Sequence, residues 1–135
     1  MKATGGARGT SAPKLVVVID DNALVLEATE GLLRSWGFQV IVAESDVQAM
    51  ARLAAFGRRP DIIVCDYRLA EGARGTDVIA RLRSAFEIPA LLISGDASSP
   101  RFDNAAGGYQ LLHKPLDAAA LRNALNDAAT LRLGE

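Results

Sequence analysis

The sequence is poor in cysteine, in aromatic residues and in net charge. It contains one cysteine, and aromatic residues make up 5% of its 135 residues. The lone Cys65 cannot form an internal disulfide, which favours a reducing compartment. Because 15 basic residues nearly balance 16 acidic ones, no broad positive field exists to attract a nucleic-acid backbone. We therefore expect no binding to nucleic acid.

Long hydrophobic runs are also missing. No apolar run approaches the roughly 20 residues that a helix needs to cross a bilayer. The amino terminus lacks the apolar centre of a signal peptide. We therefore expect a cytoplasmic protein without membrane contact by this chain.

The length and the apolar content predict one globular domain. Half of the residues are hydrophobic, which is enough for one core in a chain of this length. Residues 1–12, MKATGGARGTSA, are rich in small residues without periodicity and predict a flexible tail or linker. The predicted domain spans residues 13–135.

From Pro13 onward, short apolar runs alternate with longer amphipathic segments. This alternation is typical of an α/β protein, a three-layer sandwich in which helices cover both faces of a parallel sheet. Five segments are predicted strands: Leu15–Ile19, Phe38–Ala43, Ile62–Asp66, Ala90–Ser94 and Tyr109–Leu112.

The segments between these strands carry helix signals. Asn22 is a predicted N-cap, and Ser45 with Gln48 has the spacing of a capping box. A third helix is expected to open at Gly75 or Thr76, and a last one near Asp117. Only residues 98–108 are available for a fourth helix, which is therefore expected to be short or mobile. The predicted inward faces are Val25, Ala28, Leu32 and Trp36; Val47, Met50 and Ala54; Val78, Ile79, Leu82 and Phe86; and Leu121, Leu125 and Ala128.

Polar residues stand where the predicted strands end. Asp20 and Asp21 follow the first strand, and repulsion between them must be relieved by a cation, a proton or water. The carboxyl ends of parallel strands form the functional edge of such sheets, so these acids should meet the other strand-end groups, Asp66, Ser94 and Lys114. Carboxylates with incomplete protein coordination suit Mg²⁺.

The same group of residues suits phosphoryl transfer, which needs mainly positioning and electrostatic stabilisation. Asp66 is the predicted nucleophile because the first-strand acids can hold the metal while Asp66 faces Lys114 and Ser94. Lys114 would supply a fixed positive charge, and Ser94 would supply a hydrogen-bond donor.

Four motifs occur in order at these strand ends: VVVIDDN, IIVCDYRL, LLISGD and LLHKPL. Together they resemble the receiver domain of two-component response regulators, over Lys14 to Leu131. The resemblance implies a flavodoxin-like (βα)5 fold with strand order 2-1-3-4-5. It also implies a phosphohistidine donor, that is, a histidine kinase or a histidine phosphotransfer domain.

The resemblance assigns roles by position. Asp66 corresponds to the phosphoacceptor, Asp20 and Asp21 to the metal-binding acid pair, and Ser94 to the switch hydroxyl. Lys114 corresponds to the family's lysine, and the backbone carbonyl of Arg68 to the group that completes the Mg²⁺ shell. In the family, the proline after this lysine, here Pro115, usually follows a cis peptide bond. The chain is expected to accept a phosphoryl group without being an enzyme in its own right.

The sequence departs from the commonest receiver pattern. Ala70 stands where a proline is frequent, and one extra residue separates Asp66 from the loop glycine, Gly75. Leu111 replaces an aromatic switch residue, and Tyr109 is too far along its strand to substitute. With the short fourth helix, these features most resemble the receiver at the carboxyl end of a hybrid sensor histidine kinase. A free-standing receiver is the alternative, and the sequence leaves a weak homodimer open.

Several other interpretations stay open at this point. Asp20 and Asp21 alone could serve to cap a helix. Cys65 is expected to pack in the core rather than to have a redox role. His113 is expected to be structural rather than to carry a phosphoryl group. A Mg²⁺-dependent phosphatase of the haloacid dehalogenase type needs an acid two residues after its nucleophile, where this chain has Arg68. A pseudo-receiver that binds partners without phosphorylation would lack an acid or the lysine, and none is missing.

Overall fold

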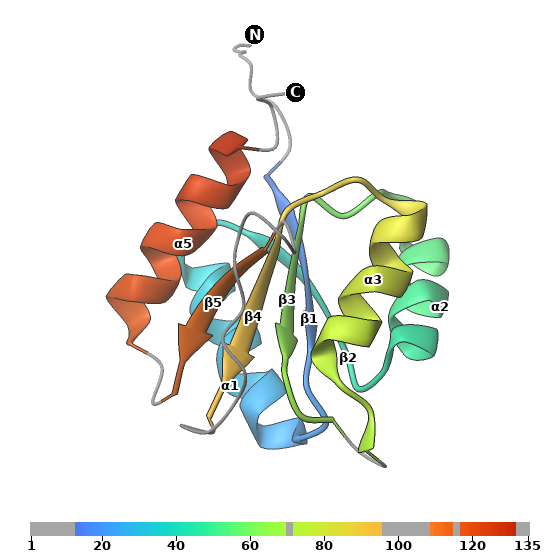
Figure 1. The fold of residues 1–135 in the computed structure, drawn as a ribbon. Coiled ribbons are helices and arrows are strands. Elements are labelled where there is room, and N and C mark those ends of the chain that lie inside the picture. Colours follow the sequence, from blue (N-terminus) through green and yellow to red (C-terminus); the bar gives the residue numbers. More distant parts are fainter. Residues whose placement is uncertain (1–12, 70–71, 96–108, 115–116, 132–135) are drawn as a thin grey trace, which may run out of the picture.

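A computed structural model describes residues 13–69, 72–95, 109–114 and 117–131. In this part of the chain, five parallel strands form one sheet in the order β2-β1-β3-β4-β5, as predicted (Figure 1). The predicted strand boundaries differ from the structure by one residue at most, at the start of the second strand and the end of the fifth. The strands are β1 (Leu15–Ile19), β2 (Gln39–Ala43), β3 (Ile62–Asp66), β4 (Ala90–Ser94) and β5 (Tyr109–His113).

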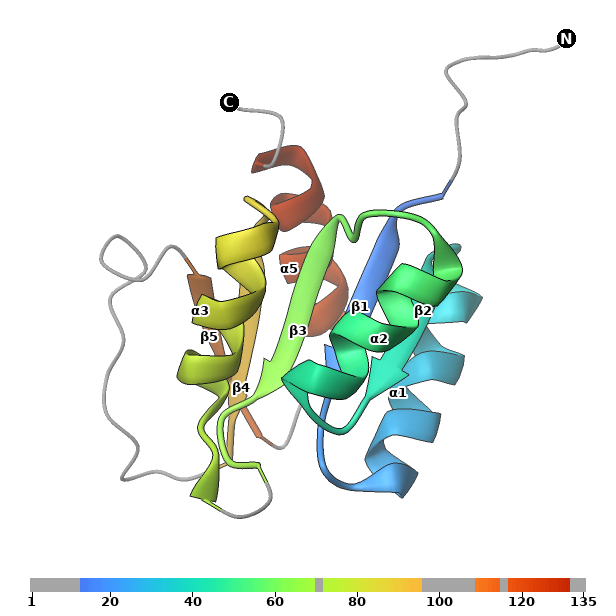
Figure 2. The same cartoon turned by 90° about the vertical axis from the view of Figure 1, so that its right-hand side faces the viewer.

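Helices cover both faces of the sheet and complete the flavodoxin-like three-layer fold. Figures 1 and 2 show α2 (Asp46–Phe56) and α3 (Gly75–Ala85) on one face, and α1 (Ala23–Ser35) and α5 (Ala118–Leu131) on the other. The segment predicted to hold a short or mobile fourth helix lies outside the described residues, as does the predicted tail of residues 1–12. None of the helices in the described ranges is long and apolar enough to cross a membrane.

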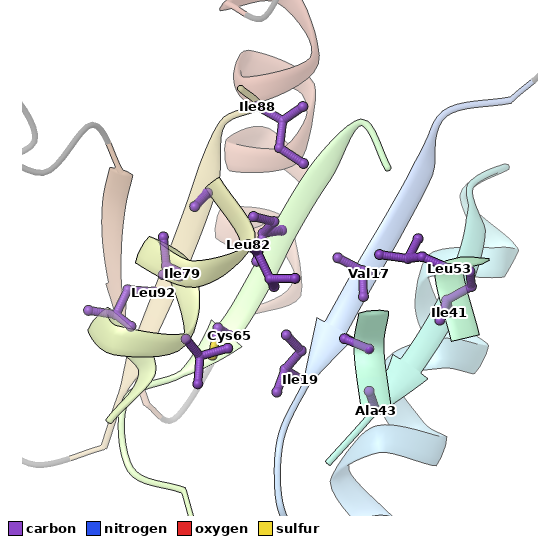
Figure 3. Close-up of a cluster of buried hydrophobic side chains, with 14 of the residues drawn as sticks. Val17, Ile19, Ile41, Ala43, Leu53, Cys65, Ile79, Leu82, Ile88 and Leu92 are labelled. Carbon is purple, nitrogen blue, oxygen red and sulfur yellow. The ribbon is translucent and has the colours of Figure 1, made fainter. Parts of the chain in front are cut away.

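The core has two halves because successive strand residues point to opposite faces of the sheet. In β1, Val17 and Ile19 pack with α2 and α3, whereas Val16 and Val18 pack with α1 and α5. Figure 3 shows the first half, where Cys65 lies among these apolar side chains. Burial on both faces explains why the strands are continuous hydrophobic runs rather than alternating ones.

The predicted inward faces of the third and last helices are confirmed: Val78, Ile79, Leu82, Leu121, Leu125 and Ala128 are buried, and Phe86 packs partly buried against the core. The face predicted for the first helix is only partly correct. Leu32 and Trp36 pack against the core, but Val25 is 36% exposed and Ala28 is exposed. Leu26 and Leu33 are the buried residues of α1.

The face predicted for the second helix is wrong. Val47 is 74% exposed and Met50 is 39% exposed, while Ala49 and Leu53 face the core instead. The small and apolar residues of α2 are spread around the helix. Its hydrophobic periodicity therefore does not distinguish between two possible inward faces. Contact with the sheet selects the face that carries Leu53, with the small Ala49 one turn earlier allowing close approach to the strands.

A polar cluster joins the strands at the edge where β1, β2 and β3 begin. The Nη2 atom of Arg58 donates to the carbonyl oxygen of Pro13 at 2.5 Å and to Asp61 Oδ2 at 3.0 Å. The other terminal nitrogen of Arg58 donates to the side-chain oxygen of Gln39. Asp61, which is buried, also accepts from the Leu15 N–H at 2.8 Å. The guanidinium of Arg58 therefore links the chain before β1 to the starts of β2 and β3.

Arg58→Met should lower the free energy of unfolding by about 2 kcal/mol, because it removes the guanidinium that donates to the buried Asp61 carboxylate. Chemical denaturation checks this value. Arg59→Met is the matched control, since Arg59 is exposed and its guanidinium lies over the Phe86 ring at 5.8 Å. Equal losses in the two variants would contradict the role given to the Arg58 cluster.

Candidate phosphoryl-acceptor site

Three carboxylates meet at the carboxyl edge of the sheet. Asp20 and Asp21 follow β1, and Asp66 is the last residue of β3. One carboxylate oxygen from each lies within 4.8 Å of the others, with Asp20 and Asp66 buried and Asp21 exposed. The predicted convergence of these acids is therefore confirmed.

The start of α1 holds Asp20 in place. The Asn22 side chain is the N-cap of α1, accepting from the Leu24 and Val25 N–H groups at 2.9 and 3.1 Å. The Asn22 N–H donates to Asp20 Oδ1 at 2.9 Å. Because Asn22 supplies the cap, capping does not account for the two aspartates. The sequence identifies Asn22 as a cap, but its contact with Asp20 depends on the turn that joins β1 to α1.

The surroundings of Asp20 disfavour its charged form. Burial raises the pKa of Asp20, and the negative charges of Asp66 and Asp21 raise it further. The Asn22 N–H and the Lys114 charge lower that pKa, but the net direction is upward. The three carboxylates offer hard oxygen donors, and Asp21 leaves one side of the cluster open to solvent. This arrangement fits the ligand preferences of Mg²⁺.

Lys114 lies against the central acid. Its Nζ is 3.1 Å from Asp66 Oδ1, and its N–H donates to the Ser94 carbonyl oxygen at 2.8 Å. The stem of Lys114 lies over Gly95, where an added Cβ would come within 3.1 Å of the lysine Cδ. Strand pairing and this close packing therefore direct the ammonium toward Asp66, as predicted. Gly95 belongs to the LLISGD motif, which gives no sign of this contact.

Ser94 ends β4 at the same edge and is 1% exposed. Its neighbour Ile93 is the register partner of Asp66, so Ser94 lies one residue beyond Asp66 along the adjacent strand. On the other side, Ser94 pairs with His113 of β5. The structure thus brings Ser94 to the expected edge.

The segment after Asp66 turns back on itself. Arg68 and Arg74 form an isolated antiparallel bridge, and the Leu69 N–H donates to the Ala73 carbonyl oxygen at 2.9 Å. The loop borders a pocket of about 430 Å³ lined by Tyr67, Arg68, Leu69, Gly72, Ala73 and Arg74. Arg68 is exposed beside the site, and its carbonyl remains a predicted metal ligand. Ala70 and Pro115 lie outside the described residues.

The structure also places three further residues that the sequence analysis singled out. Tyr109 pairs with Ala90 at the opposite end of β4 from Ser94, roughly 13 Å away along the strand. Leu111 is partly buried and packs against the α2 and α3 half of the core. Cys65 is fully buried, and burial raises the pKa of its thiol, which keeps it protonated. Cys65 is therefore a core residue.

Known proteins share both the sequence pattern and the fold of this chain. Residues 16–126 match the family described as "Response regulator receiver domain". The phyllosphere-induced regulator PhyR of Methylorubrum extorquens is 28% identical over 122 residues, which are 84% of this chain and 42% of PhyR. The transcriptional regulatory protein ZraR of Salmonella typhimurium is 32% identical over 117 residues, which are 84% of this chain and 26% of ZraR. The chain therefore spans less than half the length of these two relatives.

The solved structures agree with the sequence comparison. A response regulator receiver protein from Sinorhizobium medicae has a TM-score of 0.74 and 27% identity, and covers 89% of this chain and 97% of its own. The chemotaxis response regulator CheY4 of Vibrio cholerae has the same fold, with a TM-score of 0.71, 23% identity and coverage of 87% and 99%. Because the family match spans most of the chain and all five strands follow the receiver order, the chain belongs to the family of response regulator receiver domains.

Proposed function

We propose that this receiver domain accepts a phosphoryl group on Asp66 from a phosphohistidine donor in a two-component phosphorelay. The observation that carries this proposal is the position of Asp66, within 4.8 Å of two further carboxylates and 3.1 Å from the Lys114 ammonium. An acid held between a fixed cation and a candidate metal site has the surroundings that phosphoryl transfer requires.

In the proposed reaction, a carboxylate oxygen of Asp66 attacks the phosphorus of the donor. The phosphorus–nitrogen bond breaks as the new phosphorus–oxygen bond forms, and the imidazole leaves with the bonding electron pair and takes up a proton. Asp20, Asp21, Asp66 and the Arg68 carbonyl would hold Mg²⁺, which when bound offsets the charge of the carboxylates and of the phosphoryl oxygens. Lys114 binds a phosphoryl oxygen in place of its present contact with the Asp66 carboxylate.

Ser94 and Lys114 link the new charge to the rest of the domain. Both lie at the end of the β4–β5 pair, where the Lys114 N–H binds the Ser94 carbonyl oxygen. Hydrogen bonds from these side chains to the phosphoryl oxygens would favour one of two conformational populations of the domain. Phosphorylation would thereby change which partner protein binds, with no enzymatic activity of the domain on a separate substrate.

The partner that supplies the phosphoryl group would be a histidine kinase or a histidine phosphotransfer domain, in the cytoplasm. Leu111, the altered loop before Gly75 and the short segment available for a fourth helix favour the receiver part of a hybrid sensor histidine kinase. PhyR and ZraR are named as regulators and are longer than this chain. A free-standing receiver is the alternative to the hybrid. The full reading frame distinguishes the two: a histidine-kinase core upstream of Met1 would support the hybrid.

The proposed function is tested by incubating the full chain with Mg²⁺ and a small acyl phosphate. We expect intact mass spectrometry to show the addition of one phosphoryl group. An unchanged mass under conditions that label another receiver domain would favour a pseudo-receiver, which binds partners without phosphorylation.

Lys114→Ala should separate phosphorylation from the conformational response. The metal site keeps its carboxylates, so the labelling rate should fall by no more than about tenfold, while the shift of the β4 and β5 amide signals on labelling should disappear. Amide NMR spectra before and after labelling measure this response. Lys14→Ala is the control, because Lys14 lies at the opposite edge of the sheet, and a normal response in Lys114→Ala would contradict the role of Lys114.

A further inference from the structure

The backbone of Asp66 is held differently from that of the residues before it. The register of β1 with β3 ends at Cys65, so Asp66 itself is paired only with Ile93 of β4. The following N–H, of Tyr67, donates to the Ile93 carbonyl oxygen at 2.7 Å. In the part of the chain that the structure describes, Asp66 thus has a strand neighbour on one side only, and its carbonyl oxygen accepts from Cys65 Sγ at 3.4 Å.

The first residue of α3 lies against this backbone. Gly75 is buried, and its N–H donates to the Tyr67 carbonyl oxygen at 2.6 Å. A Cβ atom at position 75 would lie 2.2 Å from the Asp66 carbonyl oxygen, 3.0 Å from the Asp66 carbonyl carbon and 2.8 Å from Leu92 Cδ1. The carbonyl oxygen belongs to the backbone and cannot turn aside as a flexible side chain would.

The need for glycine at position 75 is one of space and not of backbone angle. Positive φ angles occur at Gly37, Gly57 and Gly72, whereas Gly75 begins a regular helix. Gly72, in the same loop, has φ of 78° and no atom within 4 Å of an added Cβ. The two loop glycines thus meet different requirements.

We propose that Gly75 is a positioning residue for the acceptor: its lack of a side chain lets α3 close on the carbonyl of Asp66 and fixes the Asp66 carboxylate relative to Lys114 and the acid pair. This inference rests on the proposed function of Asp66. Any side chain at position 75 must push either α3 or the end of β3 out of place. The 3.1 Å contact with Lys114 depends on the Asp66 backbone, so such a shift disturbs the acceptor directly.

The test compares Gly75→Ala with two other glycine variants in the full chain. With Mg²⁺ and a small acyl phosphate, at a temperature where circular dichroism shows each variant folded, Gly75→Ala should lower the maximal labelling rate about 100-fold, as expected for a misplacement near 1 Å. The acyl phosphate concentration that gives half of the maximal rate should change less than about threefold, because encounter with the donor is unaffected. A loss of stability alone would not produce this pattern in folded protein.

Gly72→Ala and Gly31→Ala are the controls. Gly72→Ala strains the same loop without touching Asp66, and Gly31→Ala lies in α1 with no atom within 4 Å. Both should keep the wild-type maximal rate within about threefold, even if Gly72→Ala unfolds at a lower temperature. Equal maximal rates for Gly75→Ala and the wild type, or equal losses for Gly72→Ala and Gly75→Ala, would overturn the proposal.

A double variant covers the case in which Gly75→Ala does not fold. Gly75→Ala/Leu92→Val removes the contact with the Leu92 side chain and keeps the contact with the Asp66 carbonyl, so it should fold and still label about 100-fold more slowly than Leu92→Val alone. Recovery of the maximal rate in the double variant, or failure of the double variant to fold, would overturn the proposal. A wild-type chain that takes no label would instead contradict the proposed function.

Discussion

Asp66→Asn is expected to abolish labelling by a small acyl phosphate, while the variant stays folded. The amide has nearly the shape of the carboxylate but no nucleophilic oxygen anion, so the phosphorus–oxygen bond cannot form. Removing one of three carboxylates that lie within 4.8 Å of one another also relieves repulsion, so the free energy of unfolding should stay the same or rise. Intact mass spectrometry and chemical denaturation on the same sample measure the two effects.

Asp127→Asn provides the matched control for this variant. Asp127 is exposed on α5, away from the cluster, and its loss should leave the labelling rate unchanged. Label on Asp66→Asn at the wild-type level would show that another residue accepts the phosphoryl group, and the proposed function would then be wrong in its main residue.

Asp20→Asn should have the second largest effect on labelling, because it weakens the binding of Mg²⁺. The variant keeps an oxygen that accepts the Asn22 N–H but loses the negative charge that a divalent ion needs. We expect its affinity for Mg²⁺ to fall about 100-fold or more, so that labelling is lost at low Mg²⁺ and partly restored at high Mg²⁺. Titration calorimetry gives the affinity, and the Mg²⁺ dependence of the labelling rate gives the functional effect.

Glu44→Gln is the control for the metal, because Glu44 is an exposed acid that follows β2 and lies outside the carboxylate cluster. It should bind Mg²⁺ as the wild type does. Removal of the metal with a chelator should stop labelling of the wild-type chain, and undiminished labelling after chelation would contradict the assignment of Asp20 and Asp21.

The strands and the residues that follow them could be predicted because both depend on local sequence. Burial on two faces requires continuous apolar runs, which are visible without any tertiary information. A strand that ends in Asp66 and another that leads into Lys114 then have their functional groups at one edge of a parallel sheet. Their contact at 3.1 Å follows from the strand order, in which β3, β4 and β5 are neighbours.

The orientation of α2 could not be predicted in the same way. Its sequence, DVQAMARLAAF, is apolar on more than one face, so the period of hydrophobic residues does not choose between Met50 and Leu53. That choice depends on how closely the helix approaches β1 and β2. Helix α3 has polar residues on its outer face, and there the periodicity was sufficient.

Supporting contacts around the site are also hidden in the sequence. Gly75 and Gly95 look like ordinary turn residues, because the atoms they approach, on Asp66 and Lys114, are distant along the chain. The Arg58 cluster likewise contains hydrogen bonds between residues that are up to 46 positions apart. Short sequence motifs identify which groups carry the chemistry, whereas the contacts that hold those groups in place require the folded chain.

The most direct measurement is to identify the residue that carries the phosphoryl group. Borohydride reduces an acyl phosphate on an aspartate to the alcohol, which converts that aspartate to homoserine and marks its position for peptide mass spectrometry. After labelling with Mg²⁺ and a small acyl phosphate, we predict homoserine at position 66. Homoserine at position 20 or 21, or phosphate on His113 with residue 66 unchanged, would contradict the account.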